Sequence, residues 1–293
     1  MIHMTPPNQG NDAYAPAEIA LRVEEIGVKK ASLGTFTLLA LAVLAGAFIA
    51  LGAVFFTVVQ TGSNLGFGPA RLLAAVPFCL GLVLVLVGGG ELFTGNVLLT
   101  MAWASRRIAL RLLLRNWILA YVGNFVGALS IAALVAMAQT AKLSAGAVGV
   151  TMATLAHAKL DLTFGQALAR GVLCNLLVCL AVWLCFGART VTDKVVAVIL
   201  PVSAFVACGF EHCVANMYLV PVAIWSQADL PASAARLSWL VFLQDNLLPV
   251  TLGNIVGGTL VAAVYWAVYL RGKGPASPAD GQSTPETPRA VVP

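Results

Sequence analysis

Charge is what this sequence of 293 residues has least of. Asp, Glu, Lys and Arg make up 10% of it and hydrophobic residues make up 60%, whereas about a quarter of an ordinary soluble domain is charged. This deficit excludes an ordinary soluble domain, and in such a chain the net charge of +5 does not indicate a nucleic-acid partner. Apolar stretches of roughly 20 residues recur instead, each long enough to cross a bilayer as a helix. The sequence therefore predicts an all-α membrane protein embedded in lipid.

Histidine and cysteine are also scarce. Of the three histidines only His212 falls within a predicted span, and the six cysteines form no C-x-x-C motif. A metal or haem site needs more ligands than one histidine supplies. A serine hydrolase needs a serine paired with a base, and neither of the helix interruptions described below contains a serine. Against the alternative of an intramembrane enzyme, we therefore expect no metal, no cofactor and no enzymatic activity.

The two ends of the chain differ from its apolar middle. Residues 1–16 are polar, lack the apolar core of a signal peptide and are predicted to be disordered. Residues 17–31 mix apolar and charged side chains in a way typical of a short cytoplasmic surface helix. Residues 272–293 are rich in Pro, Ser, Thr and Gly, which predicts a disordered cytoplasmic tail. Residues 32–271 form the predicted transmembrane channel domain.

Six membrane elements follow from the apolar stretches, at about 35–60, 70–105, 112–137, 163–187, 195–226 and 247–270. One side of the predicted membrane receives most of the positive charge, namely Lys29, Lys30, Arg106, Arg107, Arg111, Arg115, Arg189, Lys194, Arg271 and Lys273. The other side receives Arg71, Lys142, Lys159 and Arg236. Because cytoplasmic loops carry the excess of Lys and Arg, we predict a multi-pass protein of the inner (plasma) membrane with both termini in the cytoplasm.

Two of these elements are interrupted by polar residues that share a pattern. Glu91-Leu-Phe-Thr-Gly-Asn96 is followed 120 residues later by Glu211-His-Cys-Val-Ala-Asn216. The segments "GNFVGAL" (123–129) and "GNIVGGTL" (253–260) repeat as well. A repeat of three spans places its second copy upside down, which predicts two inverted three-helix repeats with the second and fifth helices broken. In transporters this arrangement indicates a substrate site near the midplane, although kinked helices in a non-transporting protein are the alternative.

The interruptions have a physical explanation. Unwound backbone at membrane depth is tolerated only where it is buried in protein or lines a cavity, and Gly89 and Gly90 permit the backbone turn. We expect Glu91 and Glu211 to stabilise the breaks by bonding freed backbone N–H groups or a neighbouring amide. Thr94 is placed to cap the restarting helix, whose N-terminus favours an anion.

Three segments carry a resemblance to a known family. "LVGGGELFTG" (86–95), "GVLCNLLVCLA" (171–181) and "GFEHCVANM" (209–217) resemble signature segments of the formate–nitrite transporter family, and the chain is most similar to a bacterial formate channel. The resemblance implies an aquaporin-like fold and a homopentamer with one pore in each protomer. The small-residue faces at Gly123/Gly127 and Gly253/Gly257, which permit close packing, support the pentamer weakly. Formate is the favoured substrate, with nitrite or hydrosulfide as the alternative.

His212 is the strongest candidate for a functional side chain, because an ionisable group at membrane depth beside a helix break is functional by default. The alternative is a neutral histidine that satisfies local backbone. The resemblance places His212 opposite Thr94 at the pore centre, Lys159 at the base of an external vestibule that attracts anions, and Asn175 and Asn254 near the pore. Without the resemblance, the interpretation of Lys159 is a solvated loop residue, and that of the two asparagines is hydrogen bonding between helices. Three nearby residues receive no role: Arg170, His157 and Asp161.

Apolar constrictions on both sides of His212 are a further implication of the resemblance, formed by Phe78, Leu82, Leu92, Val178 and Phe205. A bare anion in such a slit carries a large desolvation cost. The substrate can cross as the neutral acid after taking up a proton. It can also cross as an anion that exchanges water for polar groups of the pathway. The residues do not decide between these two routes.

Overall fold

The structure, a computed structural model, describes residues 12–226 and 237–272, and every regular element within them is helical. The predictions of disorder for residues 1–11 and 273–293 lie outside the described residues, as do Arg236 and Lys273. Residues 12–15 are described. The backbone N–H of Tyr14 donates to the Gly187 carbonyl at 3.0 Å, and the Tyr14 ring is sandwiched between the guanidinium groups of Arg22 and Arg189.

The helices follow the predicted elements closely. They are α1 (Pro16–Ala31), α2 (Thr35–Gln60), α3 (Phe67–Gly88), α4 (Phe93–Asn96), α5 (Thr100–Ala104), α6 (Leu110–Met137), α7 (Ala147–Leu160), α8 (Phe164–Gly187), α9 (Val191–Ala207), α10 (Cys213–Trp225), α11 (Trp239–Val241) and α12 (Leu248–Tyr269). Within the described residues, five helical segments are long and apolar enough to cross a membrane, and α10 is a shorter apolar helix. The predicted class of all-α membrane protein is confirmed.

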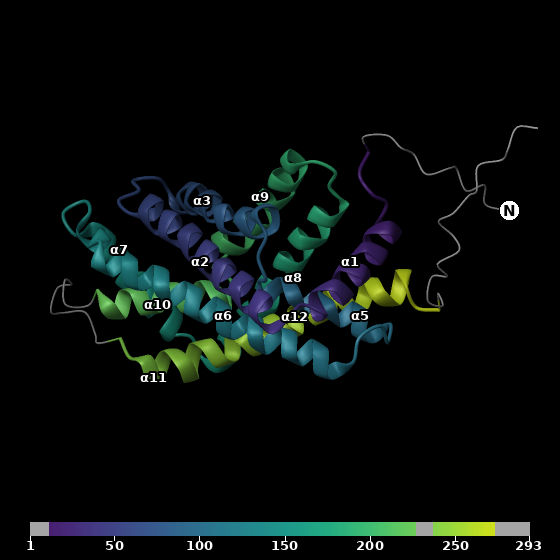
Figure 1. Cartoon of the computed structure of the whole chain (residues 1–293). Helices are drawn as coiled ribbons and strands as arrows, with labels where there is room; N and C mark the ends of the chain where they lie inside the picture. Colours follow the sequence, from purple (N-terminus) through teal and green to yellow (C-terminus); the bar gives the residue numbers. More distant parts are fainter. Residues whose placement is uncertain (1–11, 227–236, 273–293) are drawn as a thin grey trace, which may run out of the picture.

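Both predicted breaks are present. The second element is divided between α3 and α4 at residues 89–92, and the fifth is divided between α9 and α10 at residues 208–212. The helix α7 is an element that the sequence analysis did not predict. Lys159 lies in the last turn of this helix and not in a loop. Figure 1 shows α1 and α7 at opposite ends of the helix bundle. This placement supports the inverted relation of the two halves, whose six-span detail stays a prediction.

Small residues bring the helices of each half into close contact. A Cβ atom at Gly127 of α6 would overlap the Val43 carbonyl oxygen of α2, and one at Gly257 of α12 would overlap the Val172 carbonyl oxygen of α8. These faces therefore pack helices inside the protomer, where close approach of backbones needs small side chains. The interpretation of the same glycines as support for packing between protomers was wrong, because these glycines already contact a neighbouring helix of the same protomer.

The last membrane helix contains a π-helical segment, Phe242–Leu247, between α11 and α12. Single π-helical turns inside α-helices occur frequently at functional sites. This one carries Asn246, whose side chain is fully buried. The segment therefore marks the place where the last helix approaches the second break.

Candidate functional site

An asparagine from the following helix supports the first break. Gly89 has a φ of +89°, a conformation open to glycine at little cost. The Oδ1 atom of Asn124 accepts the backbone N–H of Phe93 at 2.8 Å, and its Nδ2 atom donates to the carbonyls of Ala42 and Glu91 at 2.7 and 3.0 Å. One side chain thus satisfies backbone groups that the break removes from the helix, as burial at membrane depth requires.

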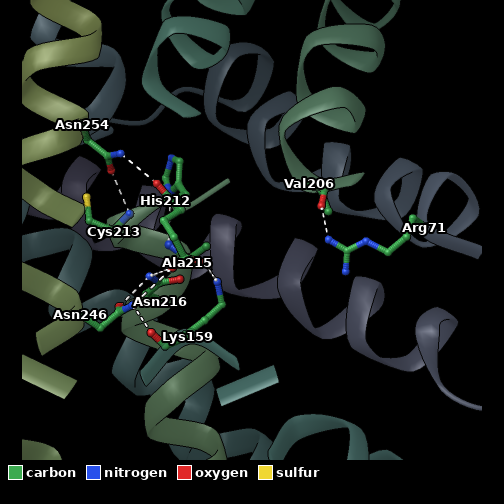
Figure 2. Close-up of polar contacts among 10 residues, drawn as sticks. Arg71, Lys159, Val206, His212, Cys213, Ala215, Asn216, Asn246 and Asn254 are labelled. Atoms are coloured by element: carbon green, nitrogen blue, oxygen red, sulfur yellow. Dashed lines mark hydrogen bonds and ion pairs between the residues drawn. The ribbon is translucent and has the colours of Figure 1, made fainter. Parts of the chain in front are cut away.

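The second break repeats this arrangement with Asn254. Its Oδ1 atom accepts the backbone N–H of Cys213 at 2.9 Å, and its Nδ2 atom donates to the carbonyls of Gly171 and Glu211 at 2.8 and 2.9 Å. Figure 2 shows Asn254 reaching from α12 to the start of α10. Every hydrogen-bonding atom of this amide is engaged with backbone, so none of its N–H groups is left for a substrate. Arg170, which received no role from the sequence, contributes its carbonyl to the N–H of Glu211.

Each break also carries a buried ion pair. Glu91 pairs with Lys30 of α1 at 2.9 Å, and Glu211 pairs with Lys159 of α7 at 2.9 Å. The second oxygen of Glu91 accepts from Asn96 at 2.7 Å, and that of Glu211 accepts from Asn216 at 2.6 Å. The expected partner of the glutamates was a freed N–H or a neighbouring amide. The structure places the amide there, together with a lysine ammonium that the sequence analysis did not assign.

A second asparagine completes each network. Asn96 donates to Asn116 at 2.9 Å, and Asn216 donates to Asn246 at 2.8 Å. Asn246 in turn donates to the backbone carbonyl of Lys159 at 3.0 Å. Figure 2 shows Asn216, Asn246 and Lys159 meeting between α7, α10 and the last helix. Both glutamates are therefore buried with their hydrogen-bonding capacity in use, the condition under which a buried charge is tolerated.

Lys30 is the functional candidate that sequence reasoning missed, having been counted only among the cytoplasmic charges. Its side chain is 24% exposed, whereas that of Lys159 is 14% exposed. A signal was present, because Lys30 precedes Lys159 by 129 residues, close to the 120 residues that separate the glutamates. An alignment of the two halves that extended to the N-terminal helix would have paired the two lysines.

His212 and Thr94 meet where the two broken helices face each other. The His212 Nε2 atom and the Thr94 hydroxyl lie 3.0 Å apart. The Nδ1 atom of His212 accepts the backbone N–H of Ala215 at 3.1 Å and so caps α10. A neutral imidazole has one N–H, so this pattern assigns the hydrogen to Nε2. His212 then donates to Thr94, whose own O–H remains to donate elsewhere.

The histidine therefore combines the two interpretations drawn from the sequence. It satisfies local backbone through Nδ1 and it contacts the opposite broken helix through Nε2. Asn175 holds Thr94 from the other side, since its Nδ2 atom donates to the carbonyls of Thr94 and Asn254 at 3.2 and 2.6 Å. The Oδ1 atom of Asn175 is buried and has no partner among the described residues.

Two cavities flank this pair. One, of about 270 Å³, is lined by residues of α1, including Val23, by the first break and by Leu82 and Leu92. The other, of about 60 Å³, lies on the Lys159 side. Its lining includes the charged, aromatic and imidazole side chains of Arg71, Phe78, Lys159, Phe205 and His212.

Four of the five predicted constriction residues thus line one cavity or the other, and Val178 is buried outside both linings. The rings of Phe78 and Phe205 meet edge to face with centroids 5.7 Å apart. Phe205 also stacks on His212 at a centroid distance of 5.9 Å. The Phe78 and Phe205 rings therefore line the smaller cavity together with His212, beside the Thr94–His212 contact. His157, which received no role, lies on α7 and is half-buried, and Asp161, which also received none, follows the end of α7 and is exposed.

Within the described residues, no three His, Cys, Asp or Glu side chains come together as possible metal ligands. The five buried cysteines and the exposed Cys208 are all free thiols. The site is instead a chain of amides, hydroxyl and imidazole between two cavities, bordered by phenyl rings.

Comparison with known proteins agrees with this geometry. The sequence profile described as "Formate/nitrite transporter" matches residues 17–267. The chain is 40% identical over 273 residues to the formate channel FocA of Escherichia coli (strain K12), covering 89% of this chain and 96% of that protein. It is 39% identical over 265 residues to the formate channel FocA of Haemophilus influenzae, covering 86% and 93% of the two chains.

Solved structures give the same answer. A pentameric formate channel with formate bound matches with a TM-score of 0.73 and 40% identity, covering 81% of this chain and 98% of that chain. An ion channel of the FNT family matches with a TM-score of 0.76 and 26% identity, covering 85% and 98% of the two chains. The broken helices, the duplicated networks and these similarities lead to one conclusion: the chain belongs to the formate/nitrite transporter family.

Proposed function

We propose that this protein conducts formate across a membrane through a pore in each protomer. The observation that carries the proposal is the Thr94–His212 contact, which joins the ends of two broken helices between two cavities. The similar proteins from Escherichia coli and Haemophilus influenzae are formate channels. Formate is small, planar and monovalent, which suits a pathway bordered by aromatic rings and containing few hydrogen-bond donors.

Thr94 is the group that donates to the substrate at the centre of the pathway in this proposal. His212 donates to its oxygen, so the Thr94 hydroxyl hydrogen is free to donate to a carboxylate oxygen. The helices α4 and α10 both begin beside the Thr94–His212 contact, and their N-termini favour negative charge nearby. Asn175 fixes the backbone of Thr94, which keeps the hydroxyl in place as the substrate passes.

His212 gives the pathway its dependence on pH. A proton added at Nδ1 would replace the acceptor of the Ala215 N–H by a donor and set two N–H groups against each other. A formate anion beside the ring would offset that loss by charge attraction. Protonation of His212 is thus linked to occupancy by the anion, and the flux is expected to follow the proton concentration.

The setting of the pore completes the proposal. The protein is an integral membrane protein, and we place it in the inner (plasma) membrane with both termini in the cytoplasm, as the distribution of Lys and Arg favours. A homopentamer with five separate pores is supported by the similar pentameric formate channel. We infer that the protein acts as a channel and not as an enzyme, because the similar proteins are named as channels.

Uptake of labelled formate and labelled nitrite into proteoliposomes, measured at several pH values, tests the proposal. We expect formate uptake that exceeds leak into protein-free liposomes and that increases as the external pH falls. Uptake of nitrite with little uptake of formate would transfer the assignment to the alternative substrate. Uptake of neither anion above the leak would contradict a channel for small monovalent anions.

A further inference from the structure

The external cavity has two cationic side chains in its lining, Lys159 and Arg71. The charge of Lys159 is matched by Glu211, whose carboxylate lies 2.9 Å from the ammonium group and is itself buried. Two opposite charges this close act on a distant anion only as a dipole. Lys159 can donate a hydrogen bond to an anion that has arrived, but the pair contributes little net positive field at the entrance.

Arg71 differs because it has no carboxylate partner among the described residues. Its Nε and Nη2 atoms donate to the backbone carbonyls of Ala207 and Val206 at 3.0 and 2.9 Å, at the end of α9. Figure 2 shows the contact between the Arg71 guanidinium and the Val206 carbonyl. These two bonds fix the guanidinium at the cavity lining while leaving its charge without a counter-ion among the described residues.

The unused hydrogens of Arg71 have a definite geometry. A guanidinium group has five N–H bonds, and the carbonyls of α9 use one on Nε and one on Nη2. Two on Nη1 and one on Nη2 remain, and one from each nitrogen forms a parallel pair at the end of the side chain. That pair matches the two oxygens of a planar carboxylate, the bidentate arrangement for which arginine is suited.

We propose that Arg71 is an anion-binding residue at the external entrance, which captures planar monovalent anions with two oxygens and delivers them to the Phe78–Phe205 rings. This proposal rests on the proposed function and adds a specificity-determining residue to it. An unpaired cation in a cleft with low-dielectric walls raises the local concentration of anions. Arg71 therefore supplies the capture that the sequence analysis assigned to Lys159.

A structural explanation of Arg71 must be separated from this one, because cations near helix C-termini also bond the last carbonyls and stabilise the helix. Two substitutions separate the explanations. Arg71→Lys keeps the charge and loses the parallel pair of N–H groups, whereas Arg71→Gln loses the charge and can still donate to one carbonyl of α9. Arg115→Gln is the matched control, because Arg115 bonds the Leu33 carbonyl at 3.0 Å and the Thr35 hydroxyl at 2.9 Å on the opposite side of the protein.

The first measurement is formate uptake into proteoliposomes, with the external concentration varied at constant pH and ionic strength. We expect Arg71→Gln to raise the half-saturating external concentration about tenfold, the effect of a unit charge ~6 Å away at an effective dielectric of about 40. Arg71→Lys should give a smaller increase, and Arg115→Gln should match the wild type. An unchanged half-saturating concentration in Arg71→Gln, or an equal increase in both variants, would overturn the proposal.

The second measurement does not depend on transport. Cys208 is the exposed cysteine and directly follows Ala207, whose carbonyl accepts from Arg71, while the other five cysteines are buried. Its rate of modification is compared for an anionic and a cationic methanethiosulfonate reagent added from outside. The ratio of anionic to cationic rate should fall several-fold in Arg71→Gln, and an unchanged ratio would show that Arg71 sets no local field. If wild-type liposomes take up no formate, the proposed function fails while this ratio still decides the role of Arg71.

Discussion

Glu211→Gln removes one charge from the second break and keeps the shape of the side chain. Gln retains an oxygen that can accept from Asn216, so the substitution isolates the contribution of charge. At 2.9 Å from Lys159, the attraction between the two charges is about 6 kcal/mol at an effective dielectric of about 20. The cost of burying both charges offsets much of this attraction, so the net value of the pair is far smaller.

The free-energy cost of removing one partner of the ion pair differs from the cost of removing both. The Lys159 side chain is 14% exposed, so in Glu211→Gln an ammonium group remains largely buried without a counter-ion. Removing one member of a buried pair costs about 3–5 kcal/mol. For a protein of this size we expect the midpoint of thermal unfolding to fall by about 10 °C.

The double variant Lys159→Met/Glu211→Gln provides the decisive comparison. It removes both charges together, so it should recover at least half of the loss seen in Glu211→Gln. The assay is the thermal midpoint of the purified protein in detergent, read from intrinsic fluorescence and from the assembled fraction on size exclusion. A midpoint for Glu211→Gln within 2 °C of the wild type would refute the reasoning. So would a double variant whose loss of stability equals the sum of the losses in Lys159→Met and Glu211→Gln.

Three further predictions follow from the geometry. Asn254→Leu removes three hydrogen bonds and leaves the N–H of Cys213 buried and unpaired; it should lower stability by about 4 kcal/mol, measured as the thermal midpoint, and an unchanged midpoint would contradict its role in the break. Gly127→Ala places a methyl group against the Val43 carbonyl and should cost about 1–3 kcal/mol, whereas Gly165→Ala, at a helical glycine with open space around it, should not destabilise the protein. His212→Asn should change the dependence of formate uptake on pH much more than the yield of assembled protein, and identical pH profiles would remove His212 from proton linkage.

Periodicity and composition predicted the membrane elements, because length and hydropathy are local properties of the chain. The two Glu-x4-Asn segments likewise predicted the breaks and their relation. The helix α7 was missed because its sequence, "AVGVTMATLAHAKL", is too short to span a bilayer and shows no polar face. A short apolar segment of this kind cannot be distinguished from a loop or a buried strand by its pattern alone.

The partners of the charged residues could not be predicted for a different reason. Lys30 reaches Glu91 only because α1 folds back onto the first break, a contact between residues 61 positions apart. Asn254 uses its whole amide on backbone groups that exist as free partners only where the helices are broken. Such contacts depend on tertiary geometry, which determines whether a polar residue faces the pathway or supports its wall.

The order of the charged residues along the chain bears on how the protein is made. In each half the lysine precedes its glutamate, Lys30 before Glu91 and Lys159 before Glu211. During synthesis each lysine therefore leaves the ribosome before the glutamate with which it pairs. Each buried carboxylate, a group that is costly to place in lipid, thus has its counter-ion in an earlier segment, whereas the asparagines that complete the breaks, Asn124 and Asn254, are synthesised later.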